Sequence, residues 1–245
     1  MNNPIQQACS HPVTSLSAFF PCYNEKDSIC ALAEKALSVA GGICDDFEVI
    51  LVDDGSSDGT TELADQLAEK YPAFRVIHHP ANKGYGAALQ SGFHAAAKEY
   101  VFYTDGDGQF DISELNNVLP LIAHCDIVSG YRLNRQEGLL RKINAFCWTK
   151  LVGFLFDLKL KDIDCAFKLY RREIFDCIEM HSTGALIDTE ILARATRKGY
   201  TVTQIGVHHY PRRAGESSGA DIKVILRAFK ELFKLRKQIR QTGNK

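Results

Sequence analysis

Short apolar runs alternate with polar loops and helix-like stretches through the first 130 residues of this chain. Amphipathic helical spacing covers residues 27–40, 60–70, 84–98 and 113–123. Around these stretches lie five apolar runs that predict strands, at residues 16–20, 49–52, 75–78, 100–104 and 127–129. Strands that alternate with helices of this length are typical of βαβ units. The pattern therefore predicts an α/β fold in which helices flank a mostly parallel, twisted sheet.

The pattern changes after residue 130. Residues 132–141 are polar and predict a loop, whereas residues 142–160 predict an unusually apolar helix that still carries Lys150 and Asp157. These charges make it too polar to span a bilayer, so it is expected to pack on the sheet or to face a lipid-like ligand. The rest of this half predicts two strands, at residues 166–170 and 202–207, and two helices, near residues 171–179 and 187–198.

A last helix is predicted from about residue 221. Its apolar positions recur at helical spacing beside a basic stripe, and residues 221–245 hold eight Lys or Arg against two Asp or Glu. A basic amphipathic helix is typical of an interfacial membrane element, and packing of its apolar face on the domain is an equal alternative. The chain is thus divided into an N-terminal extension, a main domain and a basic amphipathic C-terminal helix, at residues 1–15, 16–219 and 220–245.

The composition limits the class of protein further. The chain of 245 residues can bury a sizeable core, and its 45% apolar and 24% charged residues are typical of soluble globular proteins. A net charge of −1 gives no electrostatic footprint for nucleic acid. No run approaches the ~18 uncharged apolar residues of a membrane span, and the first 15 residues lack the pattern of a signal peptide. Eight cysteines without a Cys-x-x-Cys pair indicate a reducing compartment, so we expect a cytoplasmic protein.

Each of the first four predicted strands is followed by a polar or glycine-rich loop, at residues 21–25, 53–60, 82–86 and 105–109. Because the carboxyl ends of parallel strands meet at one edge of a sheet, the four loops should converge on one crevice. Asp105 and Asp107, separated by the small Gly106, can hold a hard divalent cation and leave room for phosphate oxygens. Asp-x-Asp alone is a weak signal because Asp and Gly are common in turns. The prediction of a cation site therefore depends on the combination of Asp-x-Asp with the other three loops.

These loops resemble the motifs of the family 2 glycosyltransferases, which have the GT-A fold. The motifs are Pro-x-Tyr-Asn-Glu from Pro21, Val-Asp-Asp-Gly-Ser-x-Asp-Gly-Thr from Val52, and Asp-x-Asp from Asp105. The resemblance runs from about Leu16 to Gly219 and is greatest to the branch of dolichol-phosphate mannose synthases and related polyprenyl-phosphate glycosyltransferases. It implies an inverting enzyme that uses Mg²⁺ or Mn²⁺ and moves a hexose from a UDP- or GDP-sugar to a polyprenyl phosphate. Such an enzyme would be peripheral at the cytoplasmic membrane face, or would act with a membrane-protein partner.

The resemblance also implies roles for individual residues. Nucleotide-sugar binding would fall to Pro21, Tyr23, Glu25, Asp53, Asp54, Lys83, Gly84 and Asp105. The metal would be held by Asp105, Asp107 and Gln109, and donor or acceptor phosphates would be bound by Arg132, Arg141 and Arg212. From the residues alone, the aspartate pair could equally form a plain strand-to-helix turn, and each basic residue could be a solvated surface group.

Asp107 is a catalytic candidate because it would hold the cation. Asp188 and Glu190 are the candidates for a general base. Many family members carry a Glu-Asp pair at the start of a late helix, where this chain has Asp188 and Glu190 instead. A sugar hydroxyl needs a base as it attacks, whereas a lipid phosphate is already anionic and needs only positioning. The departure from Glu-Asp therefore favours a phosphate acceptor, although Asp188 could also be a helix N-cap. The eight histidines show no metal spacing and are interpreted as structural or surface groups.

Other functions remain open at this stage. The same donor chemistry could act on a hydroxyl of a cell-envelope glycan or lipid, with Asp188 or Glu190 as base. A non-catalytic nucleotide-sugar-binding subunit is a different class, and complete loop motifs count against it. A nucleotidyltransferase would need a glycine-rich basic loop directly after the first strand, which this chain lacks.

Overall fold

A computed structural model describes residues 13–133, 139–211 and 222–242. Side chains at residues 139–144 and 222–230 also lie outside what it describes. Within these ranges, no helix has both the length and the apolar character needed to cross a membrane.

One seven-stranded sheet organises the molecule, in the order β3-β2-β1-β4-β6-β5-β7. The strands are β1 (Ser15–Cys22), β2 (Asp46–Asp53), β3 (Phe74–His78), β4 (Tyr100–Thr104), β5 (Ile127–Leu133), β6 (Phe167–Arg171) and β7 (Val202–His208). Neighbours pair in parallel except at β6, which is antiparallel to both β4 and β5. The predicted mostly parallel α/β sheet is confirmed.

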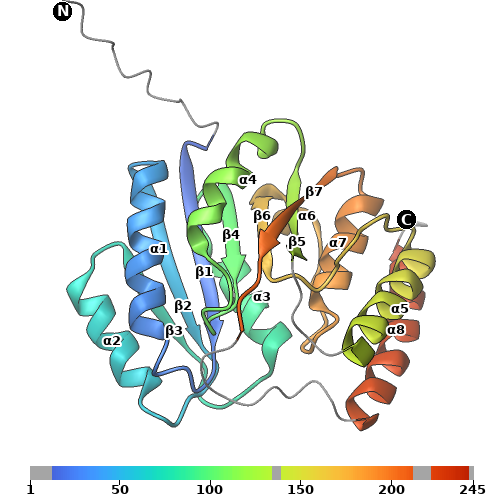
Figure 1. Ribbon diagram of the computed structural model, residues 1–245, viewed down its shortest axis with the longest axis horizontal. Coiled ribbons are helices and arrows are strands. Elements are labelled where there is room, and N and C mark those ends of the chain that lie inside the picture. Colours follow the sequence, from blue (N-terminus) through green and yellow to red (C-terminus); the bar gives the residue numbers. More distant parts are fainter. Residues whose placement is uncertain (1–12, 134–138, 212–221, 243–245) are drawn as a thin grey trace, which may run out of the picture.

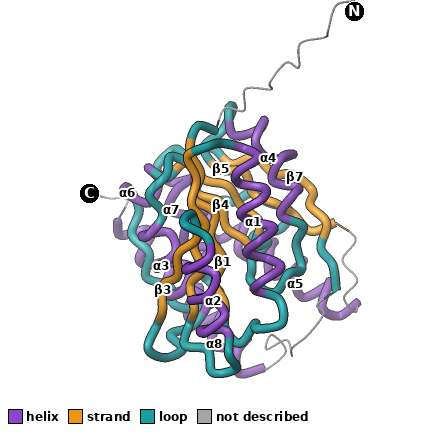
Figure 2. Tube along the Cα trace, turned by 90° about the vertical axis from the view of Figure 1, so that its left-hand side faces the viewer, coloured by secondary structure: helices purple, strands orange, loops and turns teal. Residues whose placement is uncertain are grey.

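Helices cover both faces of this sheet. They are α1 (Ile29–Ile43), α2 (Thr60–Lys70), α3 (Tyr85–Ala95), η1 (Ile112–Glu114), α4 (Leu115–Ile122), α5 (Leu139–Phe156), α6 (Glu173–Cys177), α7 (Ile187–Arg197) and α8 (Ile222–Thr242). Two views at right angles place α1 and α4 on one face and α3, α6 and α7 on the other (Figures 1 and 2). Because β1, β2 and β4 are parallel, their carboxyl ends lie at one edge of the sheet, at the bottom of Figure 1.

The apolar runs of the central strands reflect this two-sided cover. A strand with helices on both faces needs apolar side chains at consecutive positions rather than at alternate ones, and every residue of β4 is buried. Phe19 of β1 meets the edge of the Phe93 ring, with 4.8 Å between centroids. Helix α3 can approach this closely only because Gly92 has no side chain, since a Cβ there would lie 2.3 Å from the Phe19 ring.

The second half departs most from the prediction. Strand β5 continues to Leu133 into the expected loop, and α5 begins at Leu139. Helix α8 buries Leu232, Leu235 and Ile239 and contacts α7. In its described part, the apolar face of the basic helix thus packs on the domain, which was the second of the two alternatives.

Candidate active site

The loops after β1 and β2 are joined by hydrogen bonds. The amide of Asn24 donates to Ser56 Oγ (2.9 Å), and the amide of Ser57 donates back to Asn24 Oδ1 (2.8 Å). Ser28, at the start of α1, donates to the carbonyl oxygen of Gly106 (3.0 Å), which ties the Asp-x-Asp loop to the same group. The loop after β3 joins them through bonds from the amides of Lys83 and Gly84 to Asp54, so all four predicted loops meet at the carboxyl edge of the sheet.

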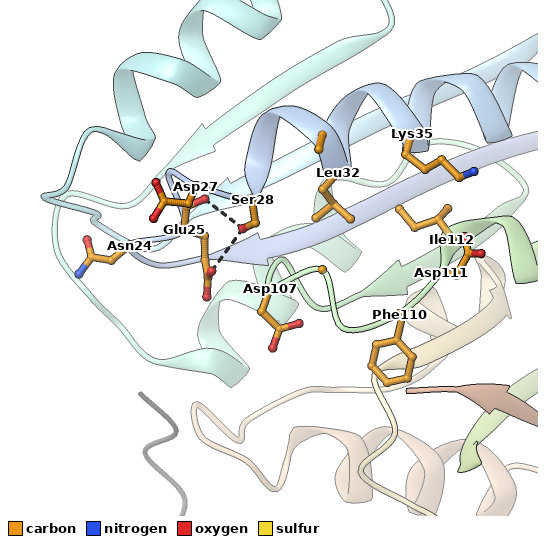
Figure 3. Close-up of a pocket in the computed structure, with 12 residues that line it drawn as sticks. Asn24, Glu25, Asp27, Ser28, Leu32, Lys35, Asp107, Phe110, Asp111 and Ile112 are labelled. Carbon is orange, nitrogen blue, oxygen red and sulfur yellow. Dashed lines mark hydrogen bonds between the residues drawn. The ribbon is translucent and has the colours of Figure 1, made fainter. Parts of the chain in front are cut away.

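A cavity of about 400 Å³ opens where these loops meet. Its walls come from the loop and first turns of α1 on one side and from residues 107–112 on the other. Glu25 and Asp107 both line it, and Figure 3 shows their side chains directed into the space between the two loops. Glu25 is steadied by Ser28, whose hydroxyl donates to its Oε2 (3.3 Å). Two residues from motifs 82 positions apart thus share one cavity.

Asp105 and Asp107 offer the hard oxygen atoms that a divalent cation prefers. Asp105 Oδ1 accepts a hydrogen bond from the Tyr85 hydroxyl (3.0 Å), and Asp107 Oδ1 accepts one from the amide of Gln109 (3.0 Å). Burial and the neighbouring charge of Asp107 raise the pKa of Asp105 to about 7. Two carboxylates that repel each other in a partly buried place are suited to a bound cation, so these residues fit Mg²⁺ or Mn²⁺.

The described residues include no cluster of three or more His, Cys, Asp or Glu side chains that could hold a metal ion unaided. Gln109, the third predicted ligand, donates through its side-chain nitrogen to the carbonyl oxygen of Tyr210 (2.9 Å). This bond leaves its side-chain oxygen available and links the cation loop to the end of β7. Phosphate oxygens and water would have to complete the coordination, as is usual for Mg²⁺.

The carboxylates of Asp53 and Asp54 are turned toward the protein. Asp53 accepts hydrogen bonds from the amide of Ser56 (3.0 Å), the hydroxyl of Thr61 (2.6 Å) and the ring of His78 (3.2 Å). These bonds lower its pKa, although burial alone would raise it. Both aspartates are nearly inaccessible, at 1% and 3% exposure. In this geometry the carboxylates organise loops, and contacts of the pair with base and ribose stay a prediction.

Asp54 holds the loop that precedes α3. Its two oxygens accept the amides of Lys83 and Gly84, both at 2.9 Å. Gly84 has a φ of +96°, and a Cβ at this position would lie 2.8 Å from the carbonyl oxygen of Thr183. Only glycine combines this backbone conformation with so close an approach. The Lys83 side chain is exposed, as is Tyr23 at 48%, whereas Pro21 is buried in β1.

The predicted phosphate-binding arginines have different outcomes. Arg132 forms a two-pronged ion pair with Asp162, at 2.8 Å and 2.9 Å, and both side chains are largely buried. Such a bidentate pair fixes the guanidinium plane, so Arg132 would reach a phosphate only while bound to Asp162. Arg212 and the side chain of Arg141 lie outside the described residues.

Asp188 belongs to a buried network beneath the edge of the sheet. Its Oδ1 accepts from Lys168 Nζ (2.7 Å) and from the hydroxyl of Tyr103, and Lys168 also donates to Tyr103 (3.0 Å) and to the carbonyl oxygen of Cys165 (2.6 Å). Lys168 is 0% exposed and Asp188 is 2% exposed. An ion-paired carboxylate without access to the surface is poorly placed to act as a general base.

Glu190 is equally enclosed. One oxygen accepts the amides of His181 (3.0 Å) and Ser182 (2.7 Å), and the other accepts Arg194 Nε (2.9 Å). Its exposure is 0%. This position does not favour the predicted role of Glu190 as a base, because one oxygen serves the loop before α7 and the other binds Arg194 within α7.

Sequence reasoning missed four residues of this region. Tyr85 bonds to Asp105, His79 bonds to Asp54, and Lys168 and Tyr103 bind Asp188. Lysine in an otherwise apolar strand-like run was a usable signal, because a buried lysine requires an anionic partner. The tyrosines and His79 gave no comparable signal in a single sequence.

Comparisons with known proteins agree with this geometry. Residues 17–179 match the family model described as glycosyl transferase family 2. An undecaprenyl-phosphate 4-deoxy-4-formamido-L-arabinose transferase from Yersinia pestis is 30% identical over 88% of this chain and 66% of its own length. A dodecaprenyl-phosphate galacturonate synthase from Rhizobium johnstonii is 32% identical over 73% of this chain and 52% of its own length. The chain thus matches about half to two thirds of these curated relatives.

Solved structures share the fold. The mannosyl-3-phosphoglycerate synthase of Rubrobacter xylanophilus superimposes with a TM-score of 0.69 at 17% identity, covering 95% of this chain and 76% of that one. The glucosyl-3-phosphoglycerate synthase of Mycobacterium tuberculosis, in complex with Mn²⁺, UDP and glucosyl-3-phosphoglycerate, gives a TM-score of 0.65 at 16% identity, covering 94% and 78% of the two chains.

Proposed function

The chain belongs to glycosyl transferase family 2, and we propose that it moves a sugar from a nucleoside diphosphate to a polyprenyl phosphate, with inversion at the anomeric carbon. The observation that carries this proposal is the shared cavity of Glu25 and Asp107 at the carboxyl edge of the sheet, beside Asp105. The names of similar proteins support a polyprenyl phosphate as the acceptor, because both curated relatives act on polyprenyl phosphates.

In this proposal Asp105 and Asp107 hold Mg²⁺ or Mn²⁺ against the donor diphosphate, and the side-chain oxygen of Gln109 can join them. The cation supplies Lewis-acid stabilisation of the charge that develops on the departing nucleoside diphosphate. Tyr85 fixes one oxygen of Asp105, and the amide of Gln109 fixes one oxygen of Asp107. Each carboxylate thus keeps its second oxygen for the cation.

The remaining residues bind and orient the substrates. Glu25 lines the cavity and would meet the nucleoside together with the exposed Tyr23, and Lys83, on a loop anchored by Asp54, would meet the diphosphate. Arg132, held by Asp162, would face the acceptor phosphate together with Arg141 and Arg212. No side chain has to take a proton from an anionic acceptor, which agrees with the engaged carboxylates of Asp188 and Glu190.

The test is a donor screen with defined acceptors. UDP- and GDP-sugars are incubated with Mn²⁺, with and without a short polyprenyl phosphate, and transfer of labelled sugar is measured. Asp107→Asn should lower turnover by more than about 100-fold because one ligand of the cation is weakened. Transfer that persists in EDTA or in Asp107→Asn would contradict the proposed chemistry.

A second candidate is a hydroxyl acceptor, and one observation favours it. Asp164 lies just before β6, beyond the carboxyl end of β4, and its side chain is exposed. A carboxylate that is open to the surface at this rim could accept a proton from a hydroxyl acceptor. Mild acid separates the two candidates, because it releases sugar from a glycosyl phosphodiester and leaves an ordinary glycoside intact.

A further inference from the structure

The loop before α3 and the first residues of that helix, together residues 79–86, are held from two sides by residues outside the cavity. On one side Asp54 accepts the amides of Lys83 and Gly84. On the other side the amide of Gly86 donates to the carbonyl oxygen of Thr183 (2.9 Å). A Cβ on Gly86 would lie 2.4 Å from the carbonyl oxygen of Ser182, so the two loops are in direct contact.

His79 fixes the first of these two supports. It is 7% exposed, with Nδ1 at 2.6 Å from Asp54 Oδ1 and Nε2 at 2.8 Å from Ser91 Oγ. A carboxylate only accepts hydrogen bonds, so Nδ1 carries a proton, and Nε2 shares the second hydrogen bond with the Ser91 hydroxyl. Both ring nitrogens are thus used, and the imidazole holds Asp54 in the one orientation that reaches both amides.

Glu190 fixes the second support. Its buried carboxylate accepts the amides of His181 and Ser182, directly before Thr183. Gln90 of α3 adds a bond from its side-chain nitrogen to the carbonyl oxygen of Ser182 (2.9 Å). The carboxylate that was expected to act as a base therefore shapes the loop that receives the amide of Gly86.

We propose that His79, acting through Asp54, is a positioning residue that holds Lys83 at the donor diphosphate, and that Glu190 steadies the same loop from the opposite side. The inference rests on the proposed function only in naming the donor as the ligand of this loop. A loop held in its binding conformation does not lose freedom when the ligand arrives, which preserves affinity. The expected effect of releasing it is therefore on donor affinity rather than on the chemical step.

The experiment compares His79→Leu with His79→Asn. Leucine removes both polar contacts, whereas an asparagine amide nitrogen can replace Nδ1 as the donor to Asp54. His94→Asn is the matched control, since His94 is exposed on α3 and, within the part of the chain that the structure describes, bonds only to the carbonyl oxygen of Gln90. Three quantities are measured: amide hydrogen exchange at Lys83 and Gly84, the Kd for UDP and for GDP with Mn²⁺, and kcat and KM for sugar transfer.

For His79→Leu we expect faster exchange at both amides and about tenfold weaker nucleotide binding, the worth of one hydrogen bond. The donor KM should rise in parallel while kcat changes less than about twofold. His79→Asn should recover most of the affinity, and the control should match the wild type. Should His79→Leu not fold, Ser91→Ala removes only the partner of Nε2 and should weaken binding by about threefold.

Three outcomes would overturn the inference, and they differ in what they say of the proposed function. Faster amide exchange at Lys83 and Gly84 with unchanged nucleotide affinity would show that His79 holds the loop without affecting donor binding. Wild-type protein that binds neither UDP nor GDP would remove the donor site itself, and the proposed function with it. A fall in kcat alone would also contradict a positioning role in donor binding.

Discussion

The two halves of the sheet stabilise their buried carboxylates in different ways. Around β1 to β4, Asp53 and Asp54 accept hydrogen bonds from backbone amides, a hydroxyl and two histidines. Around β5 to β7 the carboxylates of Asp162, Asp188 and Glu190 are each paired with Arg or Lys. The first arrangement relies on backbone amides, a hydroxyl and histidines, whereas the second sets a basic side chain against each carboxylate, although Glu190 also accepts two amides of the loop before α7.

This difference bears on how charged residues can be interpreted from a sequence. In the first half the motifs form loops with a fixed shape, so their positions at the sheet edge could be inferred. In the second half, two residues predicted to serve substrates also have partners within the protein: Arg132 binds Asp162, and Asp188 binds Lys168. A charged residue in a family motif can serve the fold as well as the substrate.

The largest effect is expected from Lys168→Met, which leaves Asp188 buried without its cation. Breaking a buried ion pair by removing one partner costs about 3–5 kcal/mol. Urea denaturation of the variant measures this loss. The double variant Lys168→Met with Asp188→Leu should recover most of it, because no unpaired charge remains. Equal losses in the single and double variants would contradict the ion-pair description of this half.

A smaller effect is expected from Asp54→Asn in the other half. An amide offers one accepting oxygen in place of two, so at least one contact among Lys83, Gly84 and His79 is lost. The cost should be about 1–3 kcal/mol in the free energy of unfolding, from one unsatisfied buried group. Urea denaturation measures this change in the free energy of unfolding. A loss as large as that of Lys168→Met would erase the distinction between the two halves.

His78 offers a pH test of the first half. Partial burial alone would lower its pKa, but hydrogen bonds to Asp53 and Asp65 outweigh this and raise it. The protonated ring therefore stabilises the fold fully below the unfolded pKa of about 6.5, and this contribution disappears as pH rises through the raised pKa. The stability difference between wild type and His78→Gln should be larger near pH 5.5 than at pH 9. A difference that grows with pH would contradict the pairing.

The smallest effect is expected from Tyr170→Phe. The Tyr170 hydroxyl is buried and has no hydrogen-bond partner among the described residues, although its ring stacks near Tyr103. Removing it should leave stability unchanged or slightly higher, since the folded state no longer carries an unsatisfied polar atom. Thermal unfolding checks this. A marked loss of stability would mean that the hydroxyl belongs to the neighbouring Tyr103 network.

Much of the fold could be predicted because it follows from local patterns. Continuous apolar runs marked the central strands, and glycine-rich loops after them marked the sheet edge. The antiparallel direction of β6 could not be predicted from the sequence, because a run of buried residues has the same apolar pattern in a parallel and in an antiparallel strand. The pairing of Arg132 with Asp162 was also beyond reach, because it joins residues 30 positions apart through tertiary structure alone.

The reversal of β6 has a consequence for how such a protein can diversify. Phe167 pairs with Thr104, so β6 starts at the rim where its neighbour β4 finishes. The segment entering β6 therefore reaches this rim from the opposite direction to β4, beside the loop that carries Asp105. Leu158, Ile163 and Cys165 of this segment are buried and Asp162 is paired with Arg132, so variation that spares the fold is confined to its exposed positions, Asp157, Lys159, Lys161 and Asp164.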